Sequence, residues 1–501
     1  MRSGFVRRFW EVLPAILSWG TLATLIALSW KAPMFVAIFI VLYDLYWLLK
    51  SLYLLVYLHV AFRRMKKNVE TDWPRKLEAS GSRWREIYHL IILPSYREPY
   101  EVVKASMESF FANRYPRERL IVVLATEERG GEPDREVAAR LTAEFGNLPL
   151  RFFVTIHPAN IPGELPGKGS NETWAAKKVI EEVIDPLHIP HENVLVSVFD
   201  SDTRPGPDYF SVLTNAFLTA ARPHRSSYQP IPLYMNNIRK VSVFARLNAF
   251  SSSFWQFMQQ GRPEQLVTFS SHSMPLQELI EVGFWNTDIV SEDSRIFFQC
   301  LNRYDGDWRT VPLFYPVSLD AVSGTTTFES LISLYKQQRR WAWGIENIPF
   351  IGMEFGGNPR VTLRKKIFWM LVGLEGFWSW ATSSFVIFLF GFLPNTLGGD
   401  AFRETIVSYN LPQITGTIIN ISMVGIVASA IASVLLLAPE LRRERFKWYY
   451  YAWYAVQWAL IPFTFIIFSA IPALDAQTRM VLGGKFKLGF WRTPKQQAGN
   501  S

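Results

Sequence analysis

Long apolar segments at both ends of the chain set the strongest limit on how it can fold. The five segments are residues 12–30, 33–62, 367–393, 411–438 and 448–474. Their only charged side chains are Asp44, Lys50 and Glu375. A helix of about 20 mostly apolar residues can cross a lipid bilayer. The sequence therefore predicts a transmembrane helix pair in residues 1–65, transmembrane helices in residues 357–475 and a basic tail in residues 476–501.

Basic residues beside these segments predict their orientation. Arg7 and Arg8 precede the first pair, "FRRMKK" follows it at residues 62–67, and "PELRRERFK" lies between the last two segments. Cytoplasmic loops are typically rich in Lys and Arg. We expect a multi-pass protein of the plasma membrane with residues 31–33 and 394–410 outside. Five spans would leave the tail outside, yet its stretch "GKFKLGFWRTPK" is basic and typical of a cytoplasmic segment, and the sequence leaves this conflict open.

The net charge of +9 indicates a negatively charged partner. Nucleic acid would fit such a charge, but the chain contains no recognised nucleic-acid-binding motif. Because the basic residues flank apolar segments, we expect membrane lipids as their partner and no nucleic acid. Cys300 is the only cysteine, so no intramolecular disulfide can form.

The central residues 66–356 have the charge density of a soluble, cytoplasmic domain. Predicted strands at residues 88–98, 120–128, 150–157 and 193–200 alternate with predicted helices at residues 102–113, 134–145 and 171–184. Because the strands are continuously apolar, we expect an α/β, Rossmann-like domain whose mostly parallel sheet is covered on both faces. Ligands in such sheets bind at the carboxyl ends of the strands. The acids expected there are Glu98, Glu127, Glu128, Asp200 and Asp202.

Asp200 and Asp202 form a D-x-D pair directly after the strand at residues 193–200. Taken alone, the pair is explained by the turn that ends a strand, since Asp is a common turn residue. Two carboxylates can also hold a divalent cation, which can in turn hold a diphosphate. The choice between these interpretations depends on the other motifs in the chain.

Several short motifs follow one another in a characteristic order. They are "PSYRE" at residues 94–98, the acids of "ATEER", "GKGSNETWA" at residues 167–175, "DSD" at 200–202, "SED" at 291–293 and "QQRRW" at 337–341. In this order the chain resembles the family-2 glycosyltransferases of GT-A fold. The last motif, Q-x-x-R-W, marks the membrane-embedded branch that includes cellulose, chitin and hyaluronan synthases. The resemblance covers residues 88–344 and implies a GT-A catalytic domain inserted between transmembrane helices.

The resemblance implies donor-binding roles for several of these residues. Asp202 would bind Mg²⁺ or Mn²⁺, with Asp200 against the ion or the ribose of a nucleotide sugar. Arg340 would contact the diphosphate, although a lipid headgroup is the alternative partner for its helix. Lys168 would reach the nucleotide, unless it is an ordinary solvated loop lysine.

Glu98, Glu127 and Glu128 complete the predicted nucleotide-sugar site. Many family members have Asp after the second strand, where the nucleobase or ribose is read. Because this chain has Glu127 and Glu128 there, the expected preference for UDP is less firmly implied.

The catalytic and acceptor-binding residues follow from the later motifs. Asp293, beside Glu292, is the predicted general base, and we expect neighbouring acids to raise its pKa. An N-cap for the following helix is the alternative role of Asp293. Trp341 would stack on the acceptor sugar and Gln337 would bond near it, whereas Trp more often packs in a core. His272, in the loop "TFSSHSMPL", is a candidate acceptor contact or a structural histidine.

Three functions remain open at this point. The first is an inverting, processive β-polysaccharide synthase that secretes its product through its own helices. The second is a non-processive transferase that adds one sugar to a lipid or short glycan. The third is a membrane-anchored binder of sugar nucleotides without catalysis. No cyclic-dinucleotide receptor domain follows the last apolar segment, so control of that kind would need an accessory secretion or regulatory subunit.

A secreted polymer would need polar groups inside the apolar segments. Asp44 and Glu375 are the acids available, and Trp378 and Trp380 follow Glu375. Acids in such segments usually face a protein interior or a wet path. We expect Trp341 to face the catalytic pocket and at least one of the two acids to face the same conduit. The alternative is that both acids bond to neighbouring helices.

Overall fold

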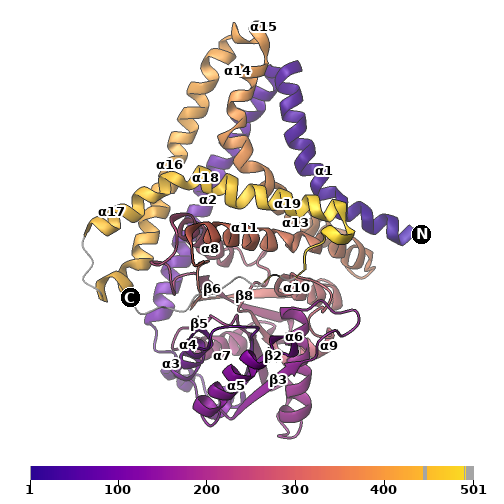
Figure 1. Ribbon diagram of the computed structural model, residues 1–501, viewed down its shortest axis with the longest axis vertical. Coiled ribbons are helices and arrows are strands. Elements are labelled where there is room, and N and C mark those ends of the chain that lie inside the picture. The colour runs from indigo at the N-terminus through magenta and orange to yellow at the C-terminus, as the bar shows by residue number, and fades with distance from the viewer. Residues whose placement is uncertain (1, 444–447, 490, 492–501) are drawn as a thin grey trace.

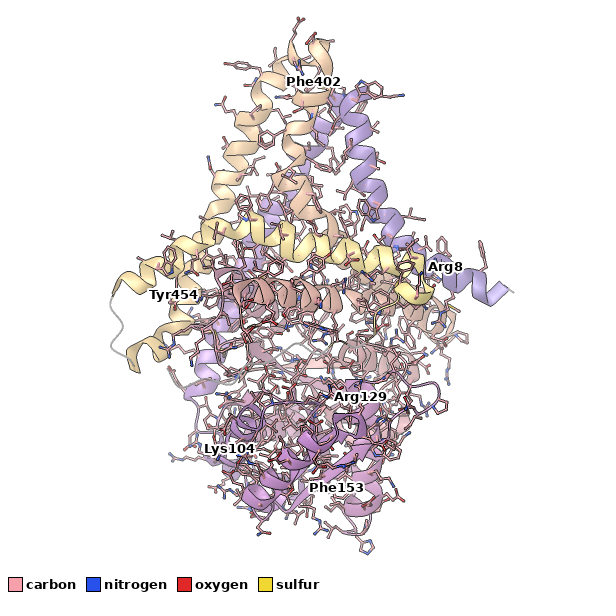
Figure 2. All side chains as sticks on the ribbon, in the orientation of Figure 1. Arg8, Lys104, Arg129, Phe153, Phe402 and Tyr454 are labelled. Carbon is pink, nitrogen blue, oxygen red and sulfur yellow. The ribbon has the colours of Figure 1, made fainter. Side chains whose placement is uncertain are left out.

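The computed structural model describes residues 2–443, 448–489 and 491. It has three layers (Figure 1). Long apolar helices form a bundle, helices that lie crosswise form a middle layer, and an α/β domain follows on the other side. Figure 2 labels Phe402 at the tip of the bundle, Arg8 and Tyr454 at the two ends of the middle layer, and Lys104 in the α/β domain.

One eight-stranded mixed sheet runs through the α/β domain in the order β3-β2-β1-β4-β7-β6-β8-β5. Its strands are β1 (Tyr88–Pro94), β2 (Leu120–Glu127), β3 (Arg151–His157), β4 (Val194–Val198), β5 (Arg204–Pro205), β6 (Ser226–Leu233), β7 (Ser273–Pro275) and β8 (Arg309–Ser318). The first four are parallel, as the sequence predicts. In the second half β7 is antiparallel to β4 and β6, and β5 is antiparallel to β8. The antiparallel strands were not expected.

The apolar strands alternate their side chains between two hydrophobic cores, one on each face of the sheet. Ile91 and Val122 belong to one core, whereas the neighbouring residues Leu90 and Ile121 belong to the other. The first core is covered by α4 (Tyr100–Phe111), α5 (Glu132–Phe145) and α7 (Tyr209–Thr219). The second is covered by α6 (Lys168–Val179), α9 (Leu276–Glu281) and α10 (Glu292–Arg303). Burial on both faces explains why these strands are apolar at successive positions.

The apolar segments form long helices. They are α1 (Arg2–Lys31), α2 (Pro33–Glu70), α13 (Leu363–Phe388) and α16 (Ile406–Arg443). By length and composition alone, the described residues contain three helices able to cross a membrane. These are Gly4–Lys31, Pro33–Glu70 and Ala452–Leu482, and a fourth results if the bent pair Leu363–Phe388 and Phe390–Leu397 is one span.

The last apolar segment is helical but lies across the bundle (Figure 1). It comprises α17 (Trp448–Val456), α18 (Ile461–Phe465) and α19 (Ile471–Leu482), joined by irregular helical turns. Beyond α19 the chain returns beside the N-terminal helix, where Lys487 lies 3.8 Å from Glu11. This apolar segment is among the helices long and apolar enough to cross a membrane, but it runs in a different direction from the helices of the bundle (Figure 1). Tail residues 490 and 492–501, and residues 444–447 of the expected basic loop, lie outside the described residues.

The boundary between bundle and α/β domain is less sharp than the predicted division at residue 65. α2 continues unbroken to Glu70. Its residues Leu58, Ala61 and Met65 share one core with the phenylalanines of α8 (Val243–Gln260). The end of α2 is therefore part of the packing of the catalytic domain.

Candidate active site

The Lys168 ammonium lies at the centre of a cluster of acids. Lys168 is the first residue of α6 and directly follows the loop after β3. Its side chain is almost fully buried. Its Nζ lies 2.8 Å from both carboxylate oxygens of Asp293 and 3.0 Å from Oδ1 of Asp200. Glu172 and Glu292 are farther away, with oxygens 3.6 and 3.8 Å from the same nitrogen. Lys168 therefore joins the D-S-D and S-E-D motifs.

Gly169 allows α6 and α10 to approach closely enough to form this cluster. A Cβ at this position would lie 2.9 Å from the carbonyl oxygen of Asn286 and 3.0 Å from the Cβ of Glu292. Neither distance is compatible with ordinary van der Waals packing. The glycine after Lys168 is thus required by the close contact between the two helices.

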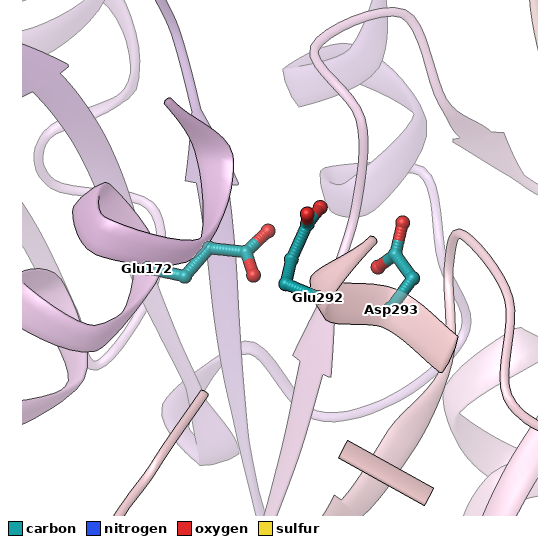
Figure 3. Close-up of side chains that lie close together, drawn as sticks. All are labelled: Glu172, Glu292 and Asp293. Atoms are coloured by element: carbon teal, nitrogen blue, oxygen red, sulfur yellow. The ribbon is translucent and has the colours of Figure 1, made fainter. Parts of the chain in front are cut away.

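Glu172, Glu292 and Asp293 form a compact group in which one oxygen from each lies within 4.8 Å of the others (Figure 3). Burial raises the pKa of Glu172 well above its usual value, and the Lys168 charge only partly opposes this shift. Burial likewise raises the pKa of Glu292, to about 8, with the Asp293 charge adding to the shift. Glu292 is therefore largely protonated at neutral pH, and burial favours the neutral form of Glu172 as well. Sequence reasoning missed Glu172, although its i,i+4 spacing from Lys168 places both on one helix face.

The expected rise in the pKa of Asp293 is wrong. Burial alone would raise this pKa, but the Lys168 charge and the His272 side chain outweigh burial and lower it below the usual range. The neighbouring acids have less effect because the ammonium lies in direct contact with the Asp293 carboxylate. Asp293 is the second residue of α10, whose N-cap position is occupied by Ser291.

Asp200 and Asp202 lie at the carboxyl end of β4, as expected, and differ in their surroundings. Asp200 keeps 32% of its side chain exposed, and one oxygen accepts a hydrogen bond from the Ser270 hydroxyl at 2.7 Å. Asp202 is buried, and its Oδ2 accepts the backbone N–H of Asp320 at 2.9 Å. Asn236 holds the turn by donating to the carbonyl oxygen of Asp202.

Two groups of carboxylates could in principle hold a divalent cation. Carboxylate oxygens are the ligands that Mg²⁺ and Mn²⁺ prefer. The group of Glu172, Glu292 and Asp293 already surrounds the Lys168 ammonium. Asp200 is open to solvent on one side and lies two residues from Asp202. Asp200 also contacts the Lys168 ammonium, at 3.0 Å, so the two groups differ in exposure and not in their contact with Lys168.

Tyr234 connects this acidic centre to the Q-x-x-R-W helix, α11 (Thr327–Ala342). Its ring centroid lies 5.7 Å from that of Trp341. Burial raises the pKa of Tyr234, the charges of Asp200 and Asp202 raise it further, and Arg340 opposes the rise. The Trp341 ring therefore lies against Tyr234, whose hydroxyl is influenced by the charges of the D-S-D pair and of Arg340. No sequence motif points to Tyr234, which directly follows β6.

The three acids expected to read the nucleotide differ in burial. Glu98, after β1, and Glu127, the last residue of β2, are buried. Glu127 forms an ion pair with Arg129, whose guanidinium lies 4.3 Å from the ring centroid of Tyr96. Glu128 is exposed and accepts the backbone N–H of Ala159 at 2.8 Å. Of the two neighbouring glutamates, Glu127 is the one on the inner side of the domain.

His272 does not lie where an acceptor sugar could touch it. Its side chain is fully buried, and its Nδ1 lies 3.5 Å from Oδ1 of Asp293. Its other ring nitrogen faces the indole N–H of Trp285 at 3.4 Å. This placement fits the structural alternative for His272. Gln337 is also buried, on α11 and four residues before Trp341.

Glu346 is a second residue that sequence reasoning missed. It lies just after α11, and its Oε1 accepts the backbone N–H groups of Val290 and Ser291, at 2.9 and 2.8 Å, and the Ser291 hydroxyl at 2.7 Å. Trp343 donates to its other oxygen. The carboxylate thus binds the N-terminal end of α10, where unpaired N–H groups and the helix dipole favour an anion. It fixes the S-E-D motif relative to Q-x-x-R-W.

Comparison with known proteins gives one family. The model described as "Glycosyl transferase family group 2" matches residues 195–468. The matched segment is more than half of the chain and contains the D-S-D, S-E-D and Q-x-x-R-W motifs. No curated protein sequence matches the chain.

Solved structures resemble the chain more distantly. The mannosyltransferase PcManGT from Pyrobaculum calidifontis, in complex with GDP-Man and Mn²⁺, is 14% identical with a TM-score of 0.36. The match covers 86% of this chain and 97% of that one. TarS 1-349 from S. aureus, in complex with UDP-GlcNAc, is 12% identical with a TM-score of 0.36, covering 72% and 93%. At these values the ligands of neither protein are carried over to this chain.

Proposed function

Because the chain belongs to glycosyl transferase family group 2, we propose that it transfers a sugar from a nucleotide sugar to a glycan acceptor with inversion at the anomeric carbon. We take the donor to be a UDP-sugar and the enzyme to be a processive β-polysaccharide synthase at the cytoplasmic face of the plasma membrane. The observation that carries the proposal is the Lys168 ammonium, which joins Asp200 of the donor motif to Asp293 of the base motif.

The leaving diphosphate needs positive charge. Arg340 offers a fixed guanidinium near the D-S-D pair, and a guanidinium can bind phosphate oxygens in a fork. Asp200 and Asp202 would hold the Mg²⁺ or Mn²⁺ ion, which when bound would neutralise charge on the diphosphate. The buried carboxylates Glu98 and Glu127 would contact the ribose or the nucleobase.

The attacking acceptor hydroxyl needs a base. Asp293 is ionised at neutral pH because Lys168 lowers its pKa, so it is ready to accept a proton. Its proton affinity is low while the ammonium remains in contact. An incoming diphosphate would compete for Lys168, weaken that contact and raise the pKa of Asp293 toward a value better suited to a base.

The acceptor would lie against Trp341, which faces Tyr234 beside the acidic centre. The contact with Tyr234 supports the proposal that Trp341 binds the acceptor. A flat indole suits stacking on a sugar ring, and an acceptor held there would present its hydroxyl toward Asp293. Gln337, one turn before Trp341, would bond to the same acceptor or to the diphosphate.

Polar pairs between the apolar helices support processive synthesis. The Tyr43 hydroxyl and the Ser383 hydroxyl lie 2.9 Å apart between α2 and α13, and Lys50 pairs with Glu375 between the same helices. Glu375 keeps 46% of its side chain exposed, and its pairing with Lys50 is also what the alternative of a bond to a neighbouring helix expects. Asp44, in contrast, is buried.

Two tryptophans of α13 make further polar contacts, each with a different neighbouring helix. Trp378 donates to the Thr21 hydroxyl at 3.0 Å, and Trp380 donates to the Ser469 hydroxyl at 2.8 Å. A glycan crossing hydrocarbon needs such partners for its hydroxyls. We take these polar contacts between the helices as support for a synthase over a transferase that adds one sugar.

Incubation of the purified protein with a panel of labelled nucleotide sugars, Mn²⁺ or Mg²⁺ and a glycan primer tests this function. We expect one UDP-sugar to be incorporated into long product. A single-sugar adduct would support the non-processive alternative. Binding without turnover of any donor would contradict both and leave a sugar-nucleotide binder.

The metal assignment has its own test. Asp202→Asn should abolish turnover that depends on added Mn²⁺ and weaken nucleotide binding in the presence of the metal. Asp208→Asn, a change to a buried aspartate that pairs with Arg114 away from the cluster, controls for general damage to the fold. Equal activity of the unmodified protein with and without a chelator would overturn the assignment.

A further inference from the structure

The C-terminal helix α19 is joined to α11 by a buried ionic contact. Oδ2 of Asp475 accepts hydrogen bonds from the Arg339 guanidinium at 2.9 Å and from the Tyr335 hydroxyl at 3.1 Å. Its Oδ1 accepts from Arg479, one turn farther along α19, at 2.7 Å. About a quarter or less of the Asp475 and Arg339 side chains is exposed. A partly desolvated, charge-assisted contact of this kind is stronger than an exposed surface pair.

The contact lies on the side of α11 opposite the residues assigned to the substrate. Tyr335 and Arg339 are four residues apart and share one face of the helix. Gln337 and Trp341 are also four residues apart and share another face. Because successive residues are turned by about 100°, the two faces are separated by roughly 200°. One side of α11 thus faces the catalytic centre and the other is bound to α19.

α19 is bound in turn to the apolar bundle. The Trp19 indole of α1 donates to the Thr478 hydroxyl at 3.0 Å, and Arg8 donates to the carbonyl oxygen of Met480 at 3.0 Å. Gln477 donates to the carbonyl oxygen of Phe377 in α13 at 3.1 Å. Within two turns, α19 therefore contacts α1, α13 and α11.

From these contacts we infer that α19 positions the Q-x-x-R-W helix relative to the bundle, and that Asp475 is the positioning residue through which it acts. The inference rests on the proposed function, since α11 carries Arg340 and Trp341. Asp475 touches neither substrate nor any residue assigned to bind it. A displacement of α11 would move the diphosphate and acceptor contacts together.

Asp475→Asn tests the inference, because it removes the charge and keeps the shape of the side chain. A misplacement of about 1 Å can cost on the order of 10²-fold in rate. We expect kcat to fall by roughly 10-fold or more, and the affinity for the nucleotide to fall with it, because Arg340 moves with α11. Arg479→Gln is the matched control, since Arg479 binds Asp475 but belongs to α19 itself. Its kcat should stay close to that of the parent.

Thermal unfolding separates positioning from stability. If Asp475→Asn lowers the unfolding temperature but each folded molecule keeps the parental kcat, the contact is merely structural and the inference is overturned. A second variant, Arg339→Cys with Asp475→Cys, should be slow until a short bis-maleimide, whose two double bonds each add one cysteine thiol, bridges the two helices. Failure of the bridged protein to regain turnover would also contradict the inference.

Hydrogen exchange gives a readout that does not need turnover. In Asp475→Asn without substrate, the backbone amides of residues 334–342 should exchange faster, while those of α6 keep their protection. Unchanged exchange in α11 would overturn the inference even in an active enzyme. If the parent turns over no nucleotide sugar, the proposed function fails, whereas faster exchange in α11 would still support the joint between the two helices.

Discussion

At the scale of single residues, the charge of the candidate site is controlled by Lys168. Four carboxylates surround one ammonium, and the two most deeply buried acids, Glu172 and Glu292, have raised pKa values. Asp293 has a lowered pKa because it contacts the ammonium directly. Acids of similar type therefore take different protonation states within a few ångströms of each other.

Lys168→Met should move the acidic limb of the pH–rate profile to higher pH. With the ammonium gone, burial and the neighbouring acids would raise the pKa of Asp293, so the base would be protonated over a wider range. An opposite charge at this distance typically lowers a carboxyl pKa by about 1 to 3 units. We expect the limb to shift by a similar amount, measured on the residual turnover. Lys177→Met, an exposed change on the same helix, should leave the profile unchanged.

Glu292→Gln should alter how stability depends on pH. The folded pKa of Glu292 is about 8, above the ordinary value of 4.5. Between these values the folded state binds more protons than the unfolded state, so this group makes the free energy of unfolding fall as pH rises from 4.5 to 8. The decline is at most about 5 kcal/mol, because one unit corresponds to roughly 1.4 kcal/mol.

Thermal unfolding between pH 5 and 8 measures this effect. The variant should lose stability less steeply than the parent over that range, and the two curves should run parallel above it. A parent and variant with equal slopes from pH 5 to 8 would show that Glu292 is already ionised in the folded protein.

At the scale of elements, α10 and α11 hold the site together through Glu346. Its carboxylate takes three hydrogen bonds from the residues that begin α10. The Arg295 side chain returns the contact by donating to the carbonyl oxygen of Glu346 and to the Asn347 side chain, at 2.7 Å each. The S-E-D and Q-x-x-R-W motifs are thus joined through Glu346.

Glu346→Gln should loosen that junction. Hydrogen bonds to a charged group contribute about 1.5 to 3 kcal/mol each, so we expect a loss of stability of roughly 1 to 3 kcal/mol and a lower kcat. Amide exchange at residues 292–295 should accelerate, because the end of α10 loses an anionic partner. Glu354→Gln, an exposed glutamate in the next helical turn, should change neither quantity. Normal turnover in Glu346→Gln would contradict the role of Glu346.

Element by element, the sequence predicted the first half of the sheet better than the second. β1 to β4 are apolar throughout and separated by helices with clear periodicity, so their order and direction follow from pattern. β5 and β7 have two and three residues, and β6 and β8 contain prolines. Short or proline-containing strands give little periodic signal. The pKa of Asp293 was mispredicted for a different reason, since its nearest charge comes from a residue 125 positions away.

At the scale of the whole molecule, hydropathy identified the apolar segments but not the direction of the last one. α17 to α19 are as apolar as a transmembrane helix, yet they lie across the bundle and carry Asp475 and Arg479 toward α11 (Figure 1). Composition does not encode which way a helix runs. The direction of this segment is evident only from the contacts that its polar residues make in the folded protein.

The side of the membrane on which each loop lies can be tested with introduced cysteines. Cys300 is fully buried, so the parent should give little background labelling. Asp400→Cys, at the tip of the bundle, should react with an impermeant thiol reagent added outside intact cells. Lys485→Cys, after α19, and Lys177→Cys, in the α/β domain, should react only after the membrane is opened. Labelling of Lys485→Cys from outside would restore the fifth span.

The core shared by α2 and α8 limits how this chain can be divided or recombined. A fragment that started after Glu70 would uncover Phe250, Phe254 and Phe257, which pack against Leu58, Ala61 and Met65. Uncovered aromatic surface of that kind promotes aggregation. The α/β domain therefore cannot be exchanged as a separate unit. A fusion of this domain to a foreign membrane anchor would have to include the last turns of α2.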